Sequence, residues 1–570
     1  MLSNLLIDVK FTFVKLGNSI RRLIKCYNIK MQENSGYKSM LAIPYKPLVL
    51  IILDGFGVNT HLPDSTWQHA KRPTFEELEK FYPFTTLQAS GPAVGLPWQE
   101  SGNSEVGHLT IGSGRVIYTH LPRIIVAIED GSFFENKALI NAASHVKKNS
   151  SALHLIGLFS TGSVHAYVEH IYALLDFALK QNIERVFLHI FTDGRDAPPE
   201  EAGEFLRKFV ENGMPKYPFA SVVSVIGRHF AMDRDGNWDR ICAAYNLLTA
   251  GIGEPYDSAA EHIEKQYAIG VTDEFITPGF LKDGSVGPAG RIKENDAVIF
   301  FNFREDSARE LTEAFIADSF DRFGRLKIPN LFFVTMTRYS EQFNVEVAFP
   351  PLDVSRPLAK VISDSGLKQL HVAETEKYAH VTYFFNGGEE KPFPGEDRNL
   401  IPSLKGARYD QHPEMAAKSV AATVVSGVGE YDFILANLAN TDMVGHTGNF
   451  EATVRAIEYV DEAVGVMVPA VLKAGGAVLI ISDHGNAEEK RYTETGRMRT
   501  KHTANPVPFW LVADGARRID ALDEPEIKKL YLRTEGVLSD VAPTILELMN
   551  LKKPEEMNGL SLLPKLFKKT

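Results

Sequence analysis

The stretch Leu-Val-Leu-Ile-Ile-Leu-Asp-Gly occupies residues 48–55. Its six apolar residues form a continuous run, which is typical of a parallel strand buried on both faces, and Asp54-Gly55 ends the run. Similar runs recur along the chain and alternate with longer helical patterns, which indicates βαβ units and a mostly parallel sheet. We therefore predict an α/β fold. The predicted strands are 48–53, 153–159, 186–191, 222–226, 297–301, 331–336, 433–438, 477–481 and 508–512.

Side chains with ligating or catalytic chemistry follow several of these runs directly. In open α/β sheets, ligands bind outside the carboxyl ends of the strands. The recurrence of such side chains after six runs therefore predicts a site at the carboxyl ends of the strands. The residues concerned include Asp54, Asp193, Arg195, Asp196, Arg228, Arg304, Asp442, His446, Asp483 and His484.

The length of 570 residues is too great for one ordinary core, so at least two domains are expected. Pro-containing stretches at 121–122 and 349–351 indicate hinges, and the segment between them has its own βα alternation. We predict a first domain formed by residues 46–121 and 351–570, for which the family resemblance given below implies a phosphatase-like metal-binding role. Residues 122–350 are predicted to be an inserted α/β domain that binds substrate. Residues 1–45 are predicted to be an N-terminal extension outside the core.

The first thirty residues carry six Lys or Arg against one Asp, with apolar residues interleaved. One interpretation is an organelle-targeting or membrane-surface helix. The alternative is an extension produced by translation starting upstream of Met31 or Met40. We favour the extension, because the segment ends in a polar stretch just before the first strand.

Charge, hydrophobicity and cysteine content argue against a nucleic-acid-binding, membrane-spanning or disulfide-rich protein. A net charge of −11 argues against a nucleic-acid partner, and no apolar run is long enough to span a bilayer. The two cysteines, Cys26 and Cys242, form neither a disulfide framework nor a metal-like spacing. We therefore expect a cytoplasmic protein that binds a small molecule and neither nucleic acid nor membrane.

A carboxylate and an imidazole stand four residues apart in Asp442-Met-Val-Gly-His446, which places them on one side of a helical turn. A lone His is more often a satisfied core residue than a ligand. Two Asp-His pairs at strand ends, however, would bury charge unless a metal neutralised it. Two metals also suit phosphoryl transfer, because they hold the attacking and leaving oxygens. We hypothesise one ion held by Asp442, His446 and His502, and a second held by Asp54, Asp483, His484 and the Ser104 oxygen.

The segment Gly102-Asn-Ser-Glu-Val-Gly-His108 follows a Gly/Pro-rich loop and opens an apolar stretch. Ser104 is therefore expected at a helix N-terminus. A plain helix cap is the simpler interpretation, but a helix N-terminus also favours an oxyanion, and a bound cation lowers the pKa of a hydroxyl. We favour Ser104 as the nucleophile, because the flanking glycines suit close approach of a substrate.

Arginines recur after apolar strands in the predicted inserted domain. A single surface Arg usually signifies only solvation, but recurrence at strand ends favours an anion pocket, because Arg forks bind carboxylate and phosphate bidentately. Lys377 follows the second hinge and is expected to bridge the two halves of a closing cleft. The predicted substrate-binding residues are His165, Arg195, Asp196, Arg228, Arg234, Arg304 and Lys377.

From about Lys46 to near the C-terminus, the sequence resembles the cofactor-independent phosphoglycerate mutases of the alkaline phosphatase superfamily. The segments that carry the resemblance are 53–57, 102–108, 192–198, 232–234, 373–381, 442–448, 482–486 and 502–508. The resemblance implies a phosphatase domain with an inserted phosphotransferase domain, two Mn²⁺-like ions, no requirement for 2,3-bisphosphoglycerate and no partner chain, hence a monomer. It implies the metal-site residues Asp54, Ser104, Asp442, His446, Asp483, His484 and His502, and the same substrate residues as above.

The activity implied is the interconversion of 3-phosphoglycerate and 2-phosphoglycerate in glycolysis and gluconeogenesis. Ser104 takes the phosphoryl group, the glycerate reorients, and its 2-hydroxyl takes the group back. We hypothesise that Asp196 is the general base and that Lys377 stabilises the transferring charge. One departure concerns Ser307, which stands where the family usually has a second Arg. The alternatives are a metal-dependent phosphatase, a phosphopentomutase-like relative, or a catalytically inactive metal-binding protein.

Overall fold

The computed structural model describes residues 44–59, 65–283, 288–352, 354–404, 406, 408–492 and 495–567. The extension expected over residues 1–45 therefore lies almost wholly outside the described residues, as does Cys26. Within the described ranges, no helix combines the length and the apolar character that a membrane span requires.

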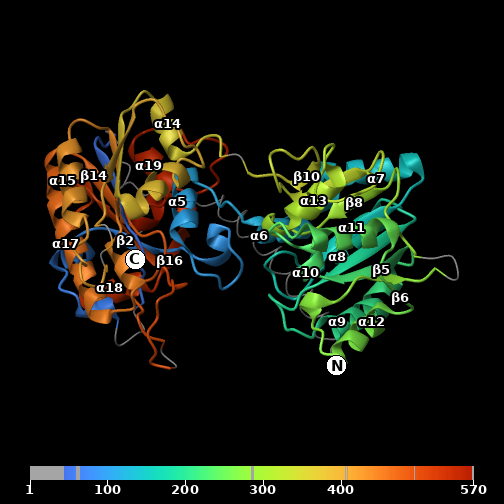
Figure 1. Cartoon of the computed structure of the whole chain (residues 1–570). Helices are drawn as coiled ribbons and strands as arrows, with labels where there is room; N and C mark the ends of the chain where they lie inside the picture. The colour runs from blue at the N-terminus through green and yellow to red at the C-terminus, as the bar shows by residue number, and fades with distance from the viewer. Residues whose placement is uncertain are drawn as a thin grey trace. The chain divides into compact units, whose positions relative to one another are not determined.

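Two compact units make up the described chain (Figure 1). Unit 1 consists of the described parts of 1–94, 99–116 and 354–570. Unit 2 consists of the described parts of 95–98 and 117–353. Each unit has its own sheet and its own hydrophobic core.

The described part of unit 1 contains one eight-stranded sheet. Its strands are β1 (Leu48–Leu53), β2 (Phe84–Gln88), β11 (Gln369–Glu374), β12 (Glu396–Ile401), β13 (Phe433–Leu438), β14 (Ala477–Ile481), β15 (Val507–Val512) and β16 (Thr534–Val537). The order is β12-β11-β13-β1-β14-β15-β2-β16. The strands from β12 to β14 are parallel to one another, and β15 is antiparallel to both of its neighbours.

Helices cover both faces of this sheet, which explains why its central strands are apolar throughout. Helices α15 and α17 pack together on one face, and α5, α14 and α19 pack together on the other (Figure 1). The helices of unit 1 are α3 (Thr66–His69), α4 (Pro73–Phe81), α5 (Ser104–Ser113), α14 (Leu358–Asp364), α15 (Ala417–Gly427), α16 (Asn440–Gly445), α17 (Phe450–Lys473), α18 (Glu524–Tyr531), α19 (Val541–Leu548) and α20 (Leu563–Leu566).

Unit 2 is built around a second, mostly parallel sheet. Its strands are β3 (Leu153–Phe159), β4 (Val186–Thr192), β5 (Ala220–Gly227), β6 (Glu254–Tyr256), β7 (Gly279–Leu281), β8 (Ala297–Phe300), β9 (Phe332–Thr337) and β10 (Glu346–Phe349). The order is β10-β9-β8-β3-β4-β5-β7-β6, and only the β5–β7 pair is antiparallel among these described strands.

The helices of unit 2 follow the strands in the βαβ manner. They are α6 (His120–Asp130), α7 (Lys137–Asn149), α8 (Val168–Lys180), α9 (Ala202–Lys208), α10 (Arg228–Ala231), α11 (Trp238–Ala250), α12 (Ala259–Tyr267) and α13 (Arg309–Ile316). Helix α7 packs against β3, β8, β9 and β10, whereas α11 and α12 pack against β5. The free thiol of Cys242 is half-buried in α11.

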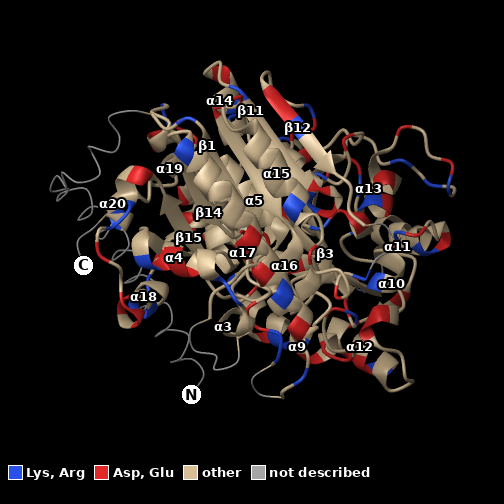
Figure 2. Ribbon diagram, turned by 90° about the vertical axis from the view of Figure 1, so that its left-hand side faces the viewer, with Lys and Arg blue, Asp and Glu red and all other residues tan. Residues whose placement is uncertain are grey.

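The predicted α/β class is confirmed, and every predicted run is a strand, with β1, β3, β13 and β14 at the predicted bounds. Seven further strands among the described residues were not predicted: β2, β6, β7, β10, β11, β12 and β16. Strand β12 shows the reason. It reads Glu-Asp-Arg-Asn-Leu-Ile and lies at the sheet edge, where only one side pairs and polar residues reach water. In Figure 2, β14 and β15 are uncharged, whereas charged residues colour β12.

Unit 2 contains a buried histidine that makes its stability sensitive to acid. Neither ring nitrogen of His170 has a hydrogen-bond partner among the described residues, and the ring contacts Tyr167 and Phe303. Burial lowers the pKa of His170 to about 3 from its ordinary 6.5. The unfolded chain therefore binds one more proton than the folded chain between these two values, so acid favours unfolding there.

We expect this histidine to contribute a loss of stability of about 1.4 kcal/mol per pH unit as pH falls below 6.5. The variant His170→Phe is expected to unfold at a temperature that depends less on pH between 6.5 and 4.5. Thermal unfolding of the two proteins across this range measures the difference. The exposed His412 provides the matched control, because His412→Phe leaves the pH dependence unchanged if burial is the cause. Equal pH slopes for His170→Phe and the parent protein would show that His170 does not carry the effect.

Candidate functional site

The carboxyl ends of three neighbouring strands form the base of a site in unit 1. Strands β13, β1 and β14 are parallel and adjacent in that order, so their ends lie side by side. Asp54 follows β1, Asp442 lies in α16 just after β13, and the pair Asp483-His484 follows β14. These four side chains are buried. The predicted gathering of residues from distant parts of the sequence therefore exists in unit 1.

Two further predicted residues, His446 and His502, meet at Asp442. Their Nε2 atoms lie 3.0 Å apart and stand 3.3 and 3.2 Å from Asp442 Oδ1. The opposite ring nitrogens face backbone carbonyls, with His446 Nδ1 2.9 Å from the Thr500 oxygen and His502 Nδ1 2.8 Å from the Gly102 oxygen. A carbonyl only accepts hydrogen bonds, so each Nδ1 carries the hydrogen, and each ring, when neutral, has a lone pair at Nε2. Asp442 raises the pKa of His446, so a proton competes with a metal ion for that lone pair.

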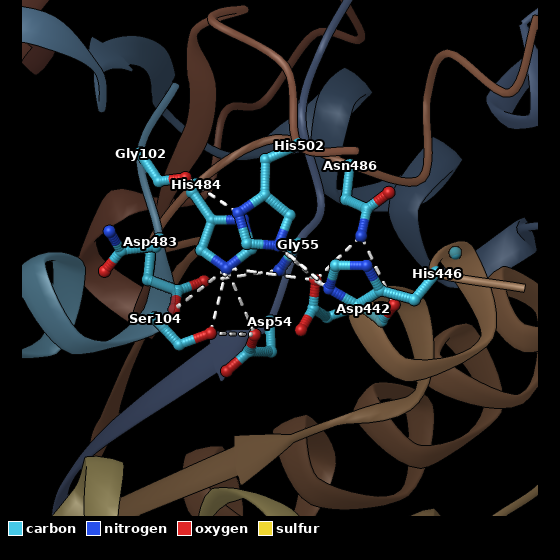
Figure 3. Close-up of polar contacts among 12 residues, drawn as sticks. Asp54, Gly55, Gly102, Ser104, Asp442, His446, Asp483, His484, Asn486 and His502 are labelled. Atoms are coloured by element: carbon cyan, nitrogen blue, oxygen red, sulfur yellow. Dashed lines mark hydrogen bonds and ion pairs between the residues drawn. The ribbon is translucent and has the colours of Figure 1, made fainter. Parts of the chain in front are cut away.

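The three atoms that converge are thus all acceptors: one carboxylate oxygen and two imidazole nitrogens. Such atoms repel one another at about 3 Å unless a proton or a metal cation lies among them. Carboxylate and imidazole donors suit Mn²⁺, Zn²⁺ and similar ions, and histidines that donate their other N–H to a carbonyl are typical metal ligands. Asp442, His446 and His502 therefore fit the first hypothesised metal site (Figure 3).

The second group surrounds Ser104 (Figure 3). His484 Nε2 lies 3.0 Å from Ser104 Oγ and 3.4 Å from Asp54 Oδ1. Asp483 Oδ2 is buried, 3.7 Å from His484 Nε2 and 3.1 Å from His108 Nδ1, but neither contact has the geometry of a hydrogen bond. A buried carboxylate oxygen without a donor is costly, and a cation would satisfy it. The donor atoms form two overlapping sets close enough to hold an ion, Asp54 with Asp442 and His484, and Asp54 with His108 and Asp483.

Lys377 lies at the centre of this second group. Its Nζ is 2.7 Å from Asp54 Oδ1, 2.7 Å from Ser104 Oγ and 2.6 Å from Asp442 Oδ2. Burial by itself lowers the pKa of Lys377, but Asp54 and Asp442 outweigh burial and raise this pKa above its ordinary value. Lys377 is therefore a buried cation that belongs to unit 1.

The carboxylates also act on His484. Burial lowers the pKa of this imidazole, but Asp483, Asp54 and Asp442 outweigh it and raise the pKa to about 9. Burial likewise raises the pKa of Asp54, and Lys377 and His484 more than reverse that effect, so the pKa of Asp54 falls below its ordinary value. The group therefore consists of ionised carboxylates held by cations, and a metal ion that binds His484 displaces a proton.

Ser104 is the first residue of α5, as predicted. The Asn103 side chain caps the helix by accepting a hydrogen bond from the Val106 N–H at 3.0 Å. The flanking glycines have a different role from the expected one, because the space beside them is filled by the protein itself. A Cβ on Gly102 would stand 2.1 Å from the Ala89 carbonyl oxygen, and one on Gly107 would stand 2.7 Å from Asp483 Cβ. These glycines bring α5 against the strand ends that hold Asp483.

A second cluster lies in unit 2, at the carboxyl ends of the adjacent parallel strands β8, β3, β4 and β5. Asp306 forms ion pairs with two arginines of this cluster. Its Oδ2 lies 2.7 Å from Arg234 NH1 and 3.1 Å from Arg304 NH2. Asp196 forms an ion pair with the third arginine, because Arg228 NH1 lies 2.6 Å from Asp196 Oδ2. His165 stands between them, 3.7 Å from a carboxylate oxygen of each Asp.

His165 is neutral in this surrounding. Burial, followed by the nearby Arg228 charge, lowers the pKa of His165 to about 4. Its Nδ1 is buried and has no hydrogen-bond partner among the described residues. The cluster therefore combines three arginines, a neutral imidazole and two carboxylates, a set able to hold a ligand with phosphate or carboxylate and hydroxyl groups.

Two residues of the predicted substrate set make none of the contacts described for this cluster. Arg195 is mostly exposed and pairs with Glu274, and Lys377 belongs to the group in unit 1. Ser307, which stands where the family usually has a second Arg, is buried, and its backbone N–H donates to Asp306 Oδ1 at 2.8 Å. The guanidinium of Arg309 does not replace the missing Arg, because its Nε donates to the Tyr339 carbonyl at 2.7 Å.

Several polar residues that contact these groups were not predicted as site residues. Asn486 Nδ2 donates to Asp442 Oδ1 at 2.8 Å, and Asn437 Nδ2 donates to Asp54 Oδ2 at 2.7 Å. Asp193 Oδ1 accepts from Arg228 at 2.6 Å. The sequence pattern could have indicated Asn437 as a site residue, because it is the polar residue in the otherwise apolar run of β13. His108 was within a quoted motif but had no assigned role.

Comparisons with known proteins agree on one family. The family model described as BPG-independent PGAM N-terminus (iPGM_N) matches residues 124–341. The 2,3-bisphosphoglycerate-independent phosphoglycerate mutase of Moorella thermoacetica is 47% identical over 525 residues, which cover 91% of this chain and 99% of that protein. The protein named 2,3-bisphosphoglycerate-independent phosphoglycerate mutase 1 of Methanosarcina acetivorans is 47% identical over 523 residues, with the same coverage.

A solved structure of Leishmania mexicana phosphoglycerate mutase at low cobalt concentration is 29% identical, covers 91% of this chain and 98% of that chain, and has a TM-score of 0.49. The sequence relatives decide the question of family, because their identity is high and extends over almost their entire length. The chain belongs to the family of 2,3-bisphosphoglycerate-independent phosphoglycerate mutases.

Proposed function

We propose that this protein interconverts 3-phosphoglycerate and 2-phosphoglycerate through a phosphoserine at Ser104, without added 2,3-bisphosphoglycerate. The names of the full-length relatives support the reaction. The observation that carries the mechanism is the surrounding of Ser104 Oγ, which has Asp54 Oδ1, His484 Nε2 and Lys377 Nζ within 3.0 Å. A cytoplasmic location and a monomeric state remain predictions.

Two divalent metal ions, for which we propose Mn²⁺, complete the site in unit 1. Asp442, His446 and His502 would hold one, and Asp54, Asp483, His484 and the Ser104 oxygen would hold the other. When bound, the ions supply positive charge that stabilises the transferring phosphoryl group and the attacking oxygen. Support comes from the converging acceptor atoms and from the buried Asp483 oxygen that has no donor among the described residues.

Ser104 is arranged to act as a nucleophile. Its hydroxyl donates to Asp54 Oδ1 at 3.0 Å, which orients the oxygen lone pairs. Lys377 Nζ, 2.7 Å from the same oxygen, stabilises the negative charge that develops as the hydroxyl loses its proton. The position at the N-terminus of α5 adds a further favourable dipole. The phosphorus–Oγ bond then forms as the bond to the glycerate 3-oxygen breaks, and the proton that leaves Ser104 is taken up by that 3-oxygen.

We propose that unit 2 is the inserted substrate-binding domain and that its cluster holds the glycerate. Arg228, Arg234 and Arg304 supply positive charge for carboxylate or phosphate. For the return step, Asp196 takes the proton of the 2-hydroxyl, and the hydroxyl oxygen forms a bond to phosphorus as the bond to Ser104 Oγ breaks. Ser104 Oγ then regains a proton, and Asp196 loses the one that it took, which restores the starting state. The ion pair with Arg228 holds the Asp196 carboxylate in place.

Replacing Asp196 by Asn is expected to lower the rate of isomerisation by about 10²–10⁴-fold, since the loss of a general base has effects of this size. Steady-state kinetics with 3-phosphoglycerate measure the change. Asp235→Asn is the matched control, because Asp235 is an exposed carboxylate of the same unit. Full isomerisation by Asp196→Asn would remove Asp196 as the base.

The proposed function is tested with the purified full-length protein. We expect Mn²⁺-dependent interconversion of the two phosphoglycerates, with no 2,3-bisphosphoglycerate added, and loss of activity after EDTA treatment. Readdition of Mn²⁺ is expected to restore the activity. Free phosphate is measured in the same assay. Release of phosphate without isomerisation would contradict the proposal and identify a phosphatase, and absence of both reactions with metal bound would indicate a non-catalytic protein.

A further inference from the structure

Two fully buried side chains, His108 and Asn437, connect the carboxylates of the unit 1 site. Asn437 is the penultimate residue of β13, and its Nδ2 lies 2.7 Å from Asp54 Oδ2 and 3.0 Å from His108 Nε2. An amide NH₂ group has two hydrogens, so this nitrogen serves both neighbours. The reverse orientation of the amide would place its oxygen against the Asp54 carboxylate and is disfavoured by repulsion.

The orientation of the Asn437 amide determines the tautomer of His108. An amide nitrogen only donates hydrogen bonds, so His108 Nε2 accepts and carries no hydrogen. The ring hydrogen is therefore at Nδ1. This atom lies 2.8 Å from the Ser104 carbonyl oxygen and 3.1 Å from Asp483 Oδ2, both of which are acceptors.

This tautomer leaves His108 without a lone pair for a metal ion. By position, His108 belongs to a possible ligand group with Asp54 and Asp483. Its Nε2 lone pair, however, is occupied by Asn437, and its Nδ1 carries the hydrogen. The contacts instead form a continuous series from Asp483 through His108 and Asn437 to Asp54.

We propose that His108 and Asn437 form a positioning pair that orients Asp54, Asp483 and the backbone of the nucleophile for metal binding. This inference rests on the proposed function of the unit 1 site. Asn437 holds Asp54 by Oδ2, which leaves Oδ1 facing Ser104 and His484. His108 restrains Asp483 and the first turn of α5 together.

Two substitutions of His108 test its two ring nitrogens separately. Gln places its amide near the position of Nε2, so His108→Gln keeps a partner for Asn437 and loses the hydrogen at Nδ1. Asn places its amide near the position of Nδ1, so His108→Asn keeps a donor for the Ser104 carbonyl beside Asp483. Asn437→Leu removes the amide at similar volume. The matched control is His380→Asn, because the half-buried His380 ring lies 5.5 Å from the His108 ring and its Nδ1 has no hydrogen-bond partner among the described residues.

The primary measurement is Mn²⁺ binding by calorimetry to the metal-stripped full-length proteins. We expect His108→Gln and Asn437→Leu to weaken Mn²⁺ binding by about 10–100-fold, the usual cost of losing a residue that orients metal ligands. His108→Asn is expected to lose less, and His380→Asn to bind as the parent does. High Mn²⁺ is expected to restore much of the kcat of the weakened variants, which distinguishes positioning from a direct catalytic role.

A second measurement is made on the metal-free parent protein. The ¹⁵N resonances of labelled histidine in the metal-free parent protein report the tautomer, and we expect a hydrogen on Nδ1 of His108, assigned by its loss in His108→Asn. A hydrogen on Nε2 would overturn the proposal, as would parental Mn²⁺ affinity in both His108→Gln and Asn437→Leu. Failure of the proposed function itself is distinguishable, because it would appear as absent isomerisation in a parent protein that binds Mn²⁺.

Discussion

Replacing Ser104 by Ala is expected to lower kcat for isomerisation by at least about 10⁴-fold, since an enzyme that loses its nucleophile retains only binding and electrostatic effects. The fold is expected to persist, because Ala is compatible with the first turn of α5 and the helix cap comes from Asn103. Steady-state kinetics give the rate, and mass spectrometry of acid-quenched protein detects the phosphoserine, which only the parent is expected to form.

Ser113→Ala provides the matched control for this substitution. Ser113 is a buried serine of the same helix, and its hydroxyl donates to the Arg115 carbonyl at 2.9 Å and contacts no residue of the site. We expect this variant to isomerise phosphoglycerate at close to the parental rate. Substantial isomerisation by Ser104→Ala, with no phosphorylated protein in the parent, would contradict the phosphoserine mechanism.

Replacing Lys377 by Met is the substitution with the second largest expected effect. The ammonium lies within 2.7 Å of Ser104 Oγ, and loss of one preorganised donor at a developing charge costs about 10²–10³-fold in kcat. The same ammonium lies next to Asp54 and Asp442, two predicted metal ligands, and repels a cation there. We therefore expect Mn²⁺ to bind Lys377→Met at least as tightly as it binds the parent protein.

The opposite changes in kcat and in Mn²⁺ affinity separate this prediction from simple damage to the fold. Lys490→Met is the matched control. Lys490 is a second buried lysine of unit 1, whose pKa is lowered to about 8 mainly by burial and whose Nζ donates to the Gly445 carbonyl at 3.0 Å. It makes no contact with Ser104, so a smaller fall in kcat is expected. Weaker Mn²⁺ binding by Lys377→Met would show that Lys377 supports the metal site rather than opposing it.

The strands predicted from sequence share one physical property. Central parallel strands such as β1 and β13 are covered by helices on both faces, so nearly every residue is apolar and the signal is strong. Strand β12 has one unpaired edge and reads as a polar segment, and the short β6 and β7 have three residues each. A pattern of hydrophobicity cannot identify such strands, because pairing with a neighbour, and not burial of side chains, makes them strands.

The candidate metal ligands were open to prediction because each follows a strong strand or lies in a distinctive motif. Parallel strands bring their carboxyl ends to one edge, so Asp54, Asp442 and Asp483 had to lie near one another once the strands were adjacent. The reason for Gly102 and Gly107 was not open to prediction in this way. It depends on the Ala89 carbonyl and on Asp483, which come close to these glycines only when the chain is folded.

By itself, the sequence determined the α/β class, the positions of the buried strands and the residue types able to bind metal and phosphate, because these follow from local patterns along the chain. The tertiary structure alone decided that Lys377 contacts Ser104, that His108 has no free lone pair, and that the Arg195 guanidinium pairs with Glu274. The physical reason is that hydrogen bonds and charge pairing act over about 3–4 Å between residues far apart in sequence.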